Sequence, residues 1–148
     1  MTQYATIEDM ELAFGVASVL KLSDRDNTRV RNDAALNSVL TKATSLANSY
    51  VDKKYAVPLT NPPDFLVSAV IDVAIYMLSR DRLTGTTELR QRYEDALKLF
   101  QQVARGEVTL AGNEPASNPD TGMPGASGSN DVYVISRERF FNRKTEII

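Results

Sequence analysis

Apolar residues recur at three- and four-residue spacing along three stretches of the chain, a pattern typical of amphipathic helices. The first stretch has eight such positions: Leu36, Val39, Leu40, Ala43, Leu46, Ala47, Tyr50 and Val51. Asn32 or Asp33 can cap its N-terminus, because short polar side chains accept hydrogen bonds from the first free backbone N–H groups. We expect this helix to run to about Lys53 or Lys54.

The second stretch, from Phe65 to about Arg80, is apolar on nearly every side. Pro63 or Asp64 opens it, and its polar residues fall on one narrow face: Ser68, Asp72 and Ser79. A helix without a broad polar side has to be surrounded, so we expect the central helix of the body or a subunit interface. Its β-branched residues also permit a strand, but its length favours a helix.

The third stretch begins at Thr86 or Thr87 and stops at Gly106, a residue type that often ends helices. Its apolar stripe comprises Leu89, Tyr93, Ala96, Leu97, Phe100, Val103 and Ala104. Two short helices precede the long ones. Thr6 caps the first, which Gly15 ends, and its apolar contacts come from Ile7, Met10, Leu12 and Phe14. The second covers Val16 to Leu22. We therefore predict a mainly α fold, a small helical bundle of three long helices plus short N-terminal helices.

The helical pattern stops after Leu110, which divides the chain into three predicted parts. Residues 1–110 form the helical body, in which the proline-containing segment 55–63 is a rigid connector. Residues 111–130 are rich in glycine and proline and are predicted to be a flexible linker or long loop. Residues 131–148 are predicted to be an extended C-terminal arm with a short β segment.

The C-terminal arm combines alternating apolar residues, two adjacent phenylalanines and several basic residues. Aromatic and arginine side chains often anchor protein interfaces, so we interpret the arm as a docking segment rather than disordered filler. Its predicted anchors are Tyr133, Ile135, Arg137, Arg139, Phe140, Phe141 and Arg143.

Composition removes many kinds of active site. The 148 residues include no cysteine and no histidine, which excludes disulfides, thiolate or imidazole metal sites and histidine-based catalysis. The net charge of −2 lacks the basic excess of a typical nucleic-acid binder. Acidic residues near the start oppose a signal peptide, and no apolar run is long enough for a membrane span. We expect a soluble, cytoplasmic protein that is not an enzyme and uses no cofactor or metal.

Four local features leave alternatives open. Asp24-Arg25-Asp26 begins like a calcium loop, but Arg29 and Ala35 replace the required glycine and glutamate, so a solvated turn is favoured. Lys53-Lys54-Tyr55 is either a nucleic-acid contact or an ordinary helix end. Asp72 is either a buried acid with a shifted pKa or part of a wet stripe or arginine pair, which we favour. The glycine-rich segment 112–128 lacks the features of a phosphate loop.

Several short motifs recur in a familiar order along almost the whole chain. They are YATIEDM at 4–10 with Phe14-Gly15, LSDRD at 22–26, SYVDKKYAVPL at 49–59, RYEDAL at 92–97, VARGEVTL at 103–110 and RFFNR at 139–143. In these motifs the chain resembles the Mu-like branch of phage head–tail connector proteins, also called adaptor or head-completion proteins.

The resemblance implies a structural virion protein. It implies a homo-oligomeric ring of about a dozen copies beneath the portal, joining the DNA-filled capsid to the tail at the head–tail junction. Ring-body contacts are then expected from Tyr50, Lys53, Lys54, Tyr55 and Pro58. The arm would dock onto the portal protein or a neighbouring subunit, and a tail terminator, stopper or other neck protein would bind the ring. Genomic DNA would pass through without sequence-specific binding. The alternative is a DNA-packaging or DNA-binding accessory protein similar to a small terminase subunit.

Overall fold

The computed structural model describes residues 2–113 and 115–116 as a bundle of five helices. In chain order they are α1 (Ile7–Phe14), α2 (Val16–Ser23), α3 (Asp33–Val51), α4 (Asp64–Asp81) and α5 (Thr87–Arg105). The predicted mainly α fold, with three long helices and two short N-terminal ones, is confirmed for these residues. The predicted arm at 131–148 and its β segment lie outside the described residues.

The helix ends follow the capping chemistry of the sequence. The Thr6 hydroxyl accepts a hydrogen bond from the Asp9 N–H at 3.1 Å, and the Asp9 carboxylate accepts one from the Thr6 N–H at 2.9 Å. This reciprocal pair is a capping box and fixes the start of α1. The Thr86 hydroxyl caps α5 by accepting a hydrogen bond from the Leu89 N–H, and Gly106 ends α5 in the left-handed conformation with φ 78°.

Helix α3 ends at Val51, two to three residues before the predicted end at Lys53 or Lys54. The chain there tightens into a turn, because the Val51 carbonyl accepts hydrogen bonds from the N–H groups of Lys54 at 3.0 Å and Tyr55 at 2.9 Å. The turn aims the following segment across the bundle instead of continuing the helix axis.

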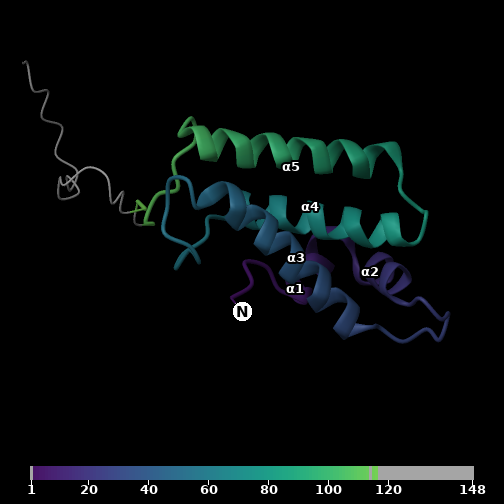
Figure 1. The fold of residues 1–148 in the computed structure, drawn as a ribbon. Coiled ribbons are helices and arrows are strands. Elements are labelled where there is room, and N and C mark those ends of the chain that lie inside the picture. The colour runs from purple at the N-terminus through teal and green to yellow at the C-terminus, as the bar shows by residue number, and fades with distance from the viewer. Residues whose placement is uncertain (1, 114, 117–148) are drawn as a thin grey trace, which may run out of the picture.

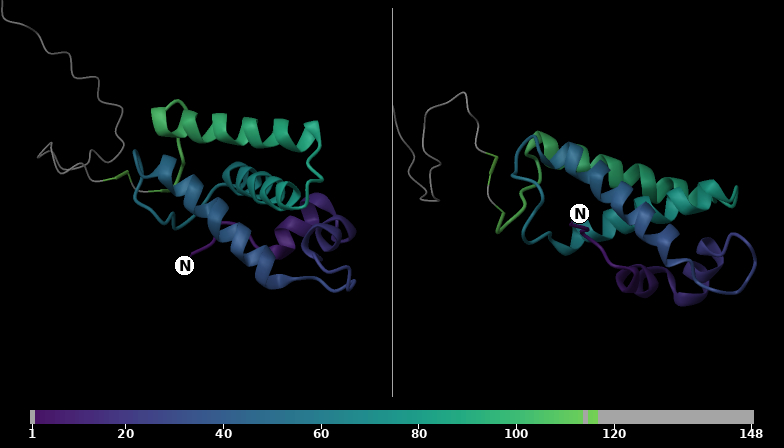
Figure 2. Two further views of the ribbon diagram at one scale, coloured as in Figure 1. Left: turned by 45° about the vertical axis from the view of Figure 1, so that its right-hand side comes forward. Right: turned by 60° about the horizontal axis from the view of Figure 1, so that its bottom comes forward.

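The apolar helix α4 lies at the centre of the bundle and contacts the other four helices. Helix α5 runs beside α4, and α3 crosses α4 on another side (Figure 1). Helices α1 and α2 pack near the N-terminal end of α3, and the loop that joins α3 to α4 lies at its opposite end (Figure 2). The prediction that α4 is the surrounded, central helix is therefore confirmed.

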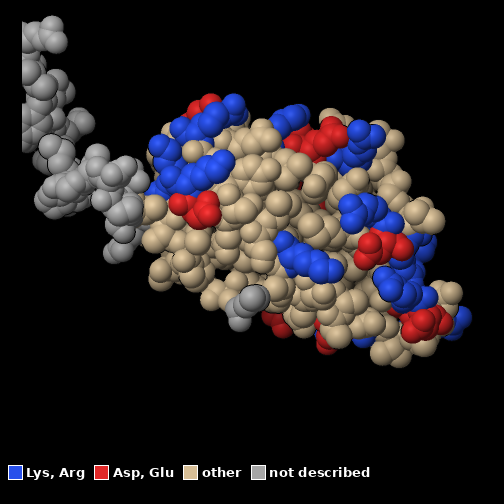
Figure 3. Space-filling model, viewed as in Figure 1, with Lys and Arg blue, Asp and Glu red and all other residues tan. Residues whose placement is uncertain are grey.

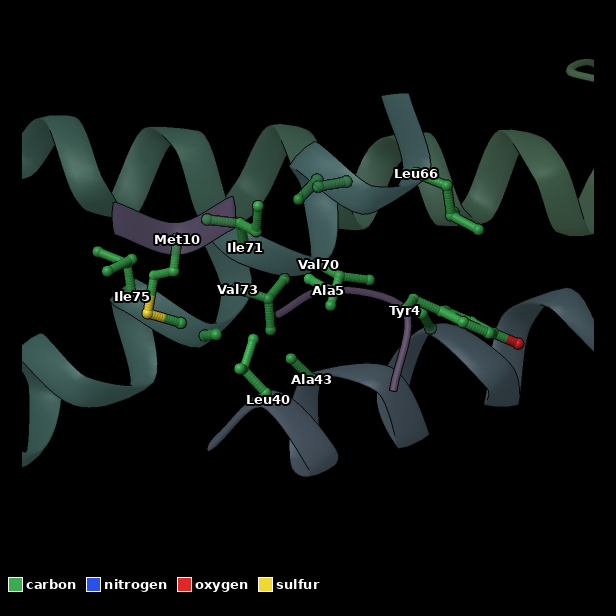
Figure 4. Close-up of a cluster of buried hydrophobic side chains, with 14 of the residues drawn as sticks. Tyr4, Ala5, Met10, Leu40, Ala43, Leu66, Val70, Ile71, Val73 and Ile75 are labelled. Carbon is green, nitrogen blue, oxygen red and sulfur yellow. The ribbon is translucent and has the colours of Figure 1, made fainter. Parts of the chain in front are cut away.

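The core is continuous from the N-terminal segment to α5. Side chains of α4 meet Met10 from α1, and Leu40 and Ala43 from α3 (Figure 4). Tyr4 and Ala5, which precede α1, are also buried in this cluster, and Phe100 of α5 is fully buried. Leu12, which we expected to supply apolar contacts, is instead 87% exposed, because α1 turns the face that carries Met10 toward the core.

The polar residues of α4 do not all face solvent. Ser68 is exposed and Asp72 is partly exposed, but Ser79 is fully buried. The Ser79 hydroxyl donates to the Tyr76 carbonyl at 2.8 Å, and the Thr84 N–H donates to the Ser79 carbonyl at 3.0 Å. The loop after α4 thus folds over Ser79, which the helical pattern alone had assigned to the narrow polar face.

Candidate docking surface

The segment between α3 and α4, residues 52–63, forms a fixed platform at one end of the bundle; we call it the connector platform. Tyr4 anchors the platform to α3. The Tyr4 hydroxyl accepts a hydrogen bond from the Leu59 N–H at 2.9 Å and donates one to the Asn48 side-chain oxygen. Burial raises the pKa of Tyr4 above its usual value, and the Leu59 hydrogen bond opposes this only in part. The predicted rigid connector is therefore anchored to α3 and to the N-terminal segment.

The last described residues of the chain lie along the connector platform. Asn61 and Asn113 exchange hydrogen bonds: the Asn61 N–H donates to the Asn113 side-chain oxygen at 3.3 Å, and the Asn113 side-chain amide donates to the Asn61 carbonyl at 2.9 Å. Tyr55 and Pro115 form an isolated antiparallel bridge, and the Ala116 N–H donates to the Lys54 carbonyl at 2.8 Å. The chain therefore leaves the described body beside Lys54.

The five predicted ring-body residues divide into two groups. Tyr50 is half-buried with its ring centroid 6.1 Å from that of Phe100. Tyr55 is also half-buried, and its hydroxyl accepts a hydrogen bond from the Leu110 N–H at 2.9 Å. Both tyrosines therefore stabilise the subunit itself.

The other three predicted ring-body residues, Lys53, Lys54 and Pro58, are exposed on the connector platform. Their side chains are available to another molecule, and their contact with a second copy stays a prediction. The predicted arm anchors lie outside the described residues: Tyr133, Ile135, Arg137, Arg139, Phe140, Phe141 and Arg143.

Basic side chains gather at the platform end of the molecule, over the C-terminal ends of α3 and α5 (Figure 3). The Lys54 ammonium lies close to Gly106, at the C-terminus of α5. It is 3.8 Å from the point where a Cβ atom would lie if Gly106 carried one. A cation at this position stabilises the negative end of the helix dipole. Lys54 therefore lies near the C-terminus of α5, and not within the last turn of α3, where the sequence had placed the lysines. Lys53 is exposed.

Arg25 and Asp26 lie in an exposed turn, as favoured from the sequence, but Asp24 is buried. Its carboxylate accepts hydrogen bonds from the backbone N–H groups of Thr28 at 2.9 Å and Arg29 at 2.7 Å, and from the Thr28 hydroxyl at 3.2 Å. Burial raises the pKa of Asp24, but these hydrogen bonds and the charge of Arg82 outweigh burial and hold the pKa below its usual value. Both carboxylate oxygens organise the loop before α3.

The described residues contain no group of three acidic side chains placed to hold a metal ion. Within the same part of the chain, none of the helices has both the length and the apolar character needed to cross a bilayer.

Asp72 of α4 pairs with an arginine, as favoured from the sequence. Its carboxylate lies 3.8 Å from the Arg92 guanidinium, which also contacts Glu88 at 3.2 Å and covers the Phe14 ring at 5.3 Å. Burial raises the pKa of Asp72, and Arg92 lowers it only in part. Arg92 thereby links α1, α4 and α5 through one guanidinium group, which gives Asp72 a structural explanation.

Comparison with known proteins places the chain among phage proteins. Residues 4–127 match the family described as "Bacteriophage Mu, Gp36". The chain is also similar to the "Mu-like prophage FluMu protein gp36" of Haemophilus influenzae, with 26% identity over 110 residues that cover 74% of this chain and 77% of the relative. The match includes all five helices and the connector platform. The chain therefore belongs to the bacteriophage Mu Gp36 family.

Proposed function

We propose that this phage protein is a head–tail connector subunit. In this proposal, about a dozen copies form a ring beneath the portal and join the DNA-filled capsid to the tail. The observation that carries the proposal is the match of residues 4–127 to the Mu Gp36 family, which agrees with the resemblance of the ordered motifs to connector proteins. The protein is not an enzyme in this role and needs no cofactor.

The geometry of the connector platform supports an assembly role. A ring subunit needs a firm body with exposed contact residues, because each subunit presents one patch to the preceding copy and a different patch to the next. The platform is clamped by Tyr4 and Asn113, while Lys53 and Pro58 remain exposed on it. The C-terminal segment departs from this same platform beside Lys54, where it can join neighbouring components.

The proposal assigns partners to the two parts of the chain. The body contacts sister subunits, and residues 131–148 dock onto the portal or an adjacent subunit. A tail terminator, stopper or other neck protein binds the ring, and genomic DNA passes through the channel without sequence-specific contacts. The protein would be found at the head–tail junction of the virion, and in the host cytoplasm during assembly.

Electron microscopy of the purified protein, with and without portal-bearing capsids, tests the proposal. We expect rings seated on the portal, and capsids that accept tails only after the protein is added. A variant lacking residues 131–148 should keep its helical circular dichroism but fail to join the capsids. Full-length protein that ignores the portal would refute the connector role. A truncated variant that completes heads normally would refute the role of the arm.

The DNA-accessory alternative requires a helix with free basic side chains for phosphate contacts. On the first half of α5, the basic residues are already paired: Arg90 contacts Glu94 at 2.9 Å, and Arg92 contacts Glu88 and Asp72. These ion pairs do not favour DNA binding by this helix. A gel-shift experiment with random duplex DNA tests the alternative, which predicts retention that weakens as the salt concentration rises.

A further inference from the structure

An open groove runs between α1 and the start of α3; we call it the α1 groove. Its volume of about 470 Å³ lies within the range of clefts that hold ligands in other proteins. Seven residues line it: Gln3, Thr6, Ile7, Glu8, Glu11, Arg31 and Asn37. Ile7 is half-buried, and Leu12, one helical turn after Glu8, is 87% exposed. The subunit therefore leaves apolar surface uncovered in the groove and beside it.

The charge around the α1 groove is negative. Four carboxylates lie in its lining or in contact with it, on Glu8, Asp9, Glu11 and Asp33. One guanidinium opposes them, since Arg31 contacts Glu11 at 2.6 Å and Asp33 at 2.5 Å. Four negative groups and one positive group give a net charge of −3. Glu8 is exposed and has no ion pair among the described residues, so its charge is available to another group.

Arg92 does not neutralise the α1 groove. Its guanidinium covers the ring of Phe14, which is the last residue of α1, whereas the groove is lined by the earlier residues of that helix. Arg92 also contacts two carboxylates of its own, Asp72 at 3.8 Å and Glu88 at 3.2 Å. Its charge is therefore offset within the subunit. Helix α1 itself contains no basic residue, so the groove keeps its negative charge.

The same chain contains a segment of opposite charge. Residues 137–144 include four basic residues, Arg137, Arg139, Arg143 and Lys144, and one acidic residue, Glu138, so their net charge is +3. Phe140 and Phe141 lie between the basic residues in the sequence. Arginine and aromatic side chains often anchor protein contacts, and opposite charges orient them. Segment 137–144 therefore matches the α1 groove in charge and can cover its apolar surface.

The place where the chain leaves the described body allows this segment to reach the groove of its own subunit. The Ala116 N–H donates to the Lys54 carbonyl on the connector platform, and Arg137 follows 21 residues later. Those residues span up to about 70 Å, whereas the 18 residues of α4 extend over only about 27 Å. A tethered segment meets its own subunit far more often than it meets a separate copy in dilute solution. The tether therefore favours the groove of the same subunit.

We infer that residues 137–144 dock into the α1 groove of their own subunit before the subunit joins a particle. The phenylalanines cover Ile7 and Leu12, and the basic residues lie beside Glu8 and Asp9. Within the proposed function, this contact withholds the arm from other free subunits. The portal or an adjacent subunit then releases the arm by binding it more tightly than the groove does. The inference rests on the proposed function only for this release.

Disulfide trapping in the full-length chain tests the contact, since the chain has no cysteine of its own. Asn37 is an exposed residue of the groove, and Asn142 follows the two phenylalanines, so Asn37→Cys with Asn142→Cys keeps all the proposed anchors. We expect gentle oxidation of the dilute protein to give an intrachain disulfide, identified by mass spectrometry of peptides. The matched control combines Asn142→Cys with Gln91→Cys, an exposed residue of α5, and should give about tenfold less product.

Charge variants test the complementarity. Glu8→Lys in the chain with Asn37→Cys and Asn142→Cys should lower the yield about threefold, because it replaces an attraction between exposed charges with a repulsion. Asp26→Lys is the matched control, since it makes the same change of charge at an exposed loop residue outside the groove, and it should leave the yield unchanged. Raising the salt concentration should lower the yield of the parent chain, because salt screens exposed charges. Circular dichroism verifies that the variants remain folded.

The outcomes separate this inference from the connector role. Equal yields from the groove pair and the α5 control, or a yield that Glu8→Lys leaves unchanged, would overturn the inference even if the protein completes heads. Predominantly interchain products would overturn it by assigning the groove to the arm of another copy. An intrachain product from a protein that never joins portal-bearing capsids would support the docking and refute the connector role. A yield that stays the same on completed heads would overturn the release of the arm.

Discussion

Replacing Tyr4 with phenylalanine removes a single oxygen atom that joins three parts of the fold. The Tyr4 hydroxyl receives the Leu59 N–H at 2.9 Å and donates to Asn48, so it connects the N-terminal segment, the connector platform and α3. Phenylalanine keeps the ring in the core but leaves the amide of Leu59, a buried residue, without its partner. We expect the platform to loosen and the whole domain to lose stability.

The size of the loss follows from the exposure of the two partners. A buried N–H group without an acceptor lowers the free energy of unfolding by about 1–3 kcal/mol, and this cost applies in full to the N–H of Leu59. Asn48 is only partly buried, so water can replace its lost hydrogen bond and the added cost stays below about 1 kcal/mol. The free energy of unfolding should fall by about 2 kcal/mol, which corresponds to a melting temperature lower by about 4–8 °C.

Urea unfolding followed by circular dichroism measures this loss, and amide hydrogen exchange at Leu59 reports the loosening of the platform. Tyr50→Phe is the matched control, because the Tyr50 hydroxyl has no hydrogen bond among the described residues and its ring contact with Phe100 is retained. A loss below about 0.5 kcal/mol for Tyr4→Phe would contradict the bridging role of the hydroxyl.

The same variant has a characteristic pH dependence. Burial raises the pKa of Tyr4 above 10.0, so the folded state holds the hydroxyl proton more tightly than the unfolded state does. The stabilisation is fully present below about pH 10 and is lost as the pH rises through the folded-state pKa. The stability difference between wild type and Tyr4→Phe should therefore be constant up to about pH 9 and narrow above about pH 10. A difference that widens in this range would have the wrong sign.

Three further changes test other features. Leu83→Asn should raise the free energy of unfolding by about 0.5–1 kcal/mol in urea titrations, because Leu83 has φ 55° and a 95% exposed side chain; a loss would contradict backbone strain. Gly106→Ala should lower it by about 1 kcal/mol, because φ is 78° there while Lys54 leaves room for a methyl group; a neutral result would contradict this explanation. Asp72→Asn should gain stability relative to wild type as the pH rises above 3.8, because the raised pKa of Asp72 makes its ionisation unfavourable in the folded state. Urea unfolding across this pH range measures the trend. An opposite trend would show that the charge of Arg92 outweighs burial in setting the pKa of Asp72.

The local chemistry of the sequence was sufficient for most helix boundaries. Thr6, Gly15, Thr86 and Gly106 were predicted to start or end helices, and each does so. These residues act on backbone groups a few positions away, so their effect can be predicted from their neighbours in the sequence. The central position of α4 was predictable for a similar reason, because a helix that is apolar nearly all round has to be covered.

Features that depend on distant partners could not be predicted in this way. The Tyr55 hydroxyl meets the Leu110 amide 55 positions later in the chain, and Tyr4 meets Leu59 across the same separation. No local spacing signals such pairs, so Tyr55 was expected to face another subunit. The burial of Asp24 was not predicted, because the donors that surround its carboxylate come from a loop without periodicity.

The candidate docking surface was predicted only in part. Lys53, Lys54 and Pro58 are exposed, and their contact with another molecule stays a prediction. No local pattern indicated that Asn113 returns to hold the platform. The exposure of Leu12 was also missed. Helical spacing identifies an apolar position without showing which of two adjacent faces a short helix turns to the core.

The hydrogen bond between the Ala116 N–H and the Lys54 carbonyl also sets the local concentration of the later residues of the chain around their own subunit. It fixes the root of the C-terminal segment on the platform, and Phe140 follows 24 residues later. Covalent geometry limits the reach of those residues to about 80 Å, whatever conformation they adopt. One phenylalanine confined to a sphere of that radius has a concentration of about 0.8 mM around its own subunit. A partner site inside this sphere would therefore be half-occupied even with a dissociation constant near 1 mM, and a site beyond it would receive no benefit from the tether.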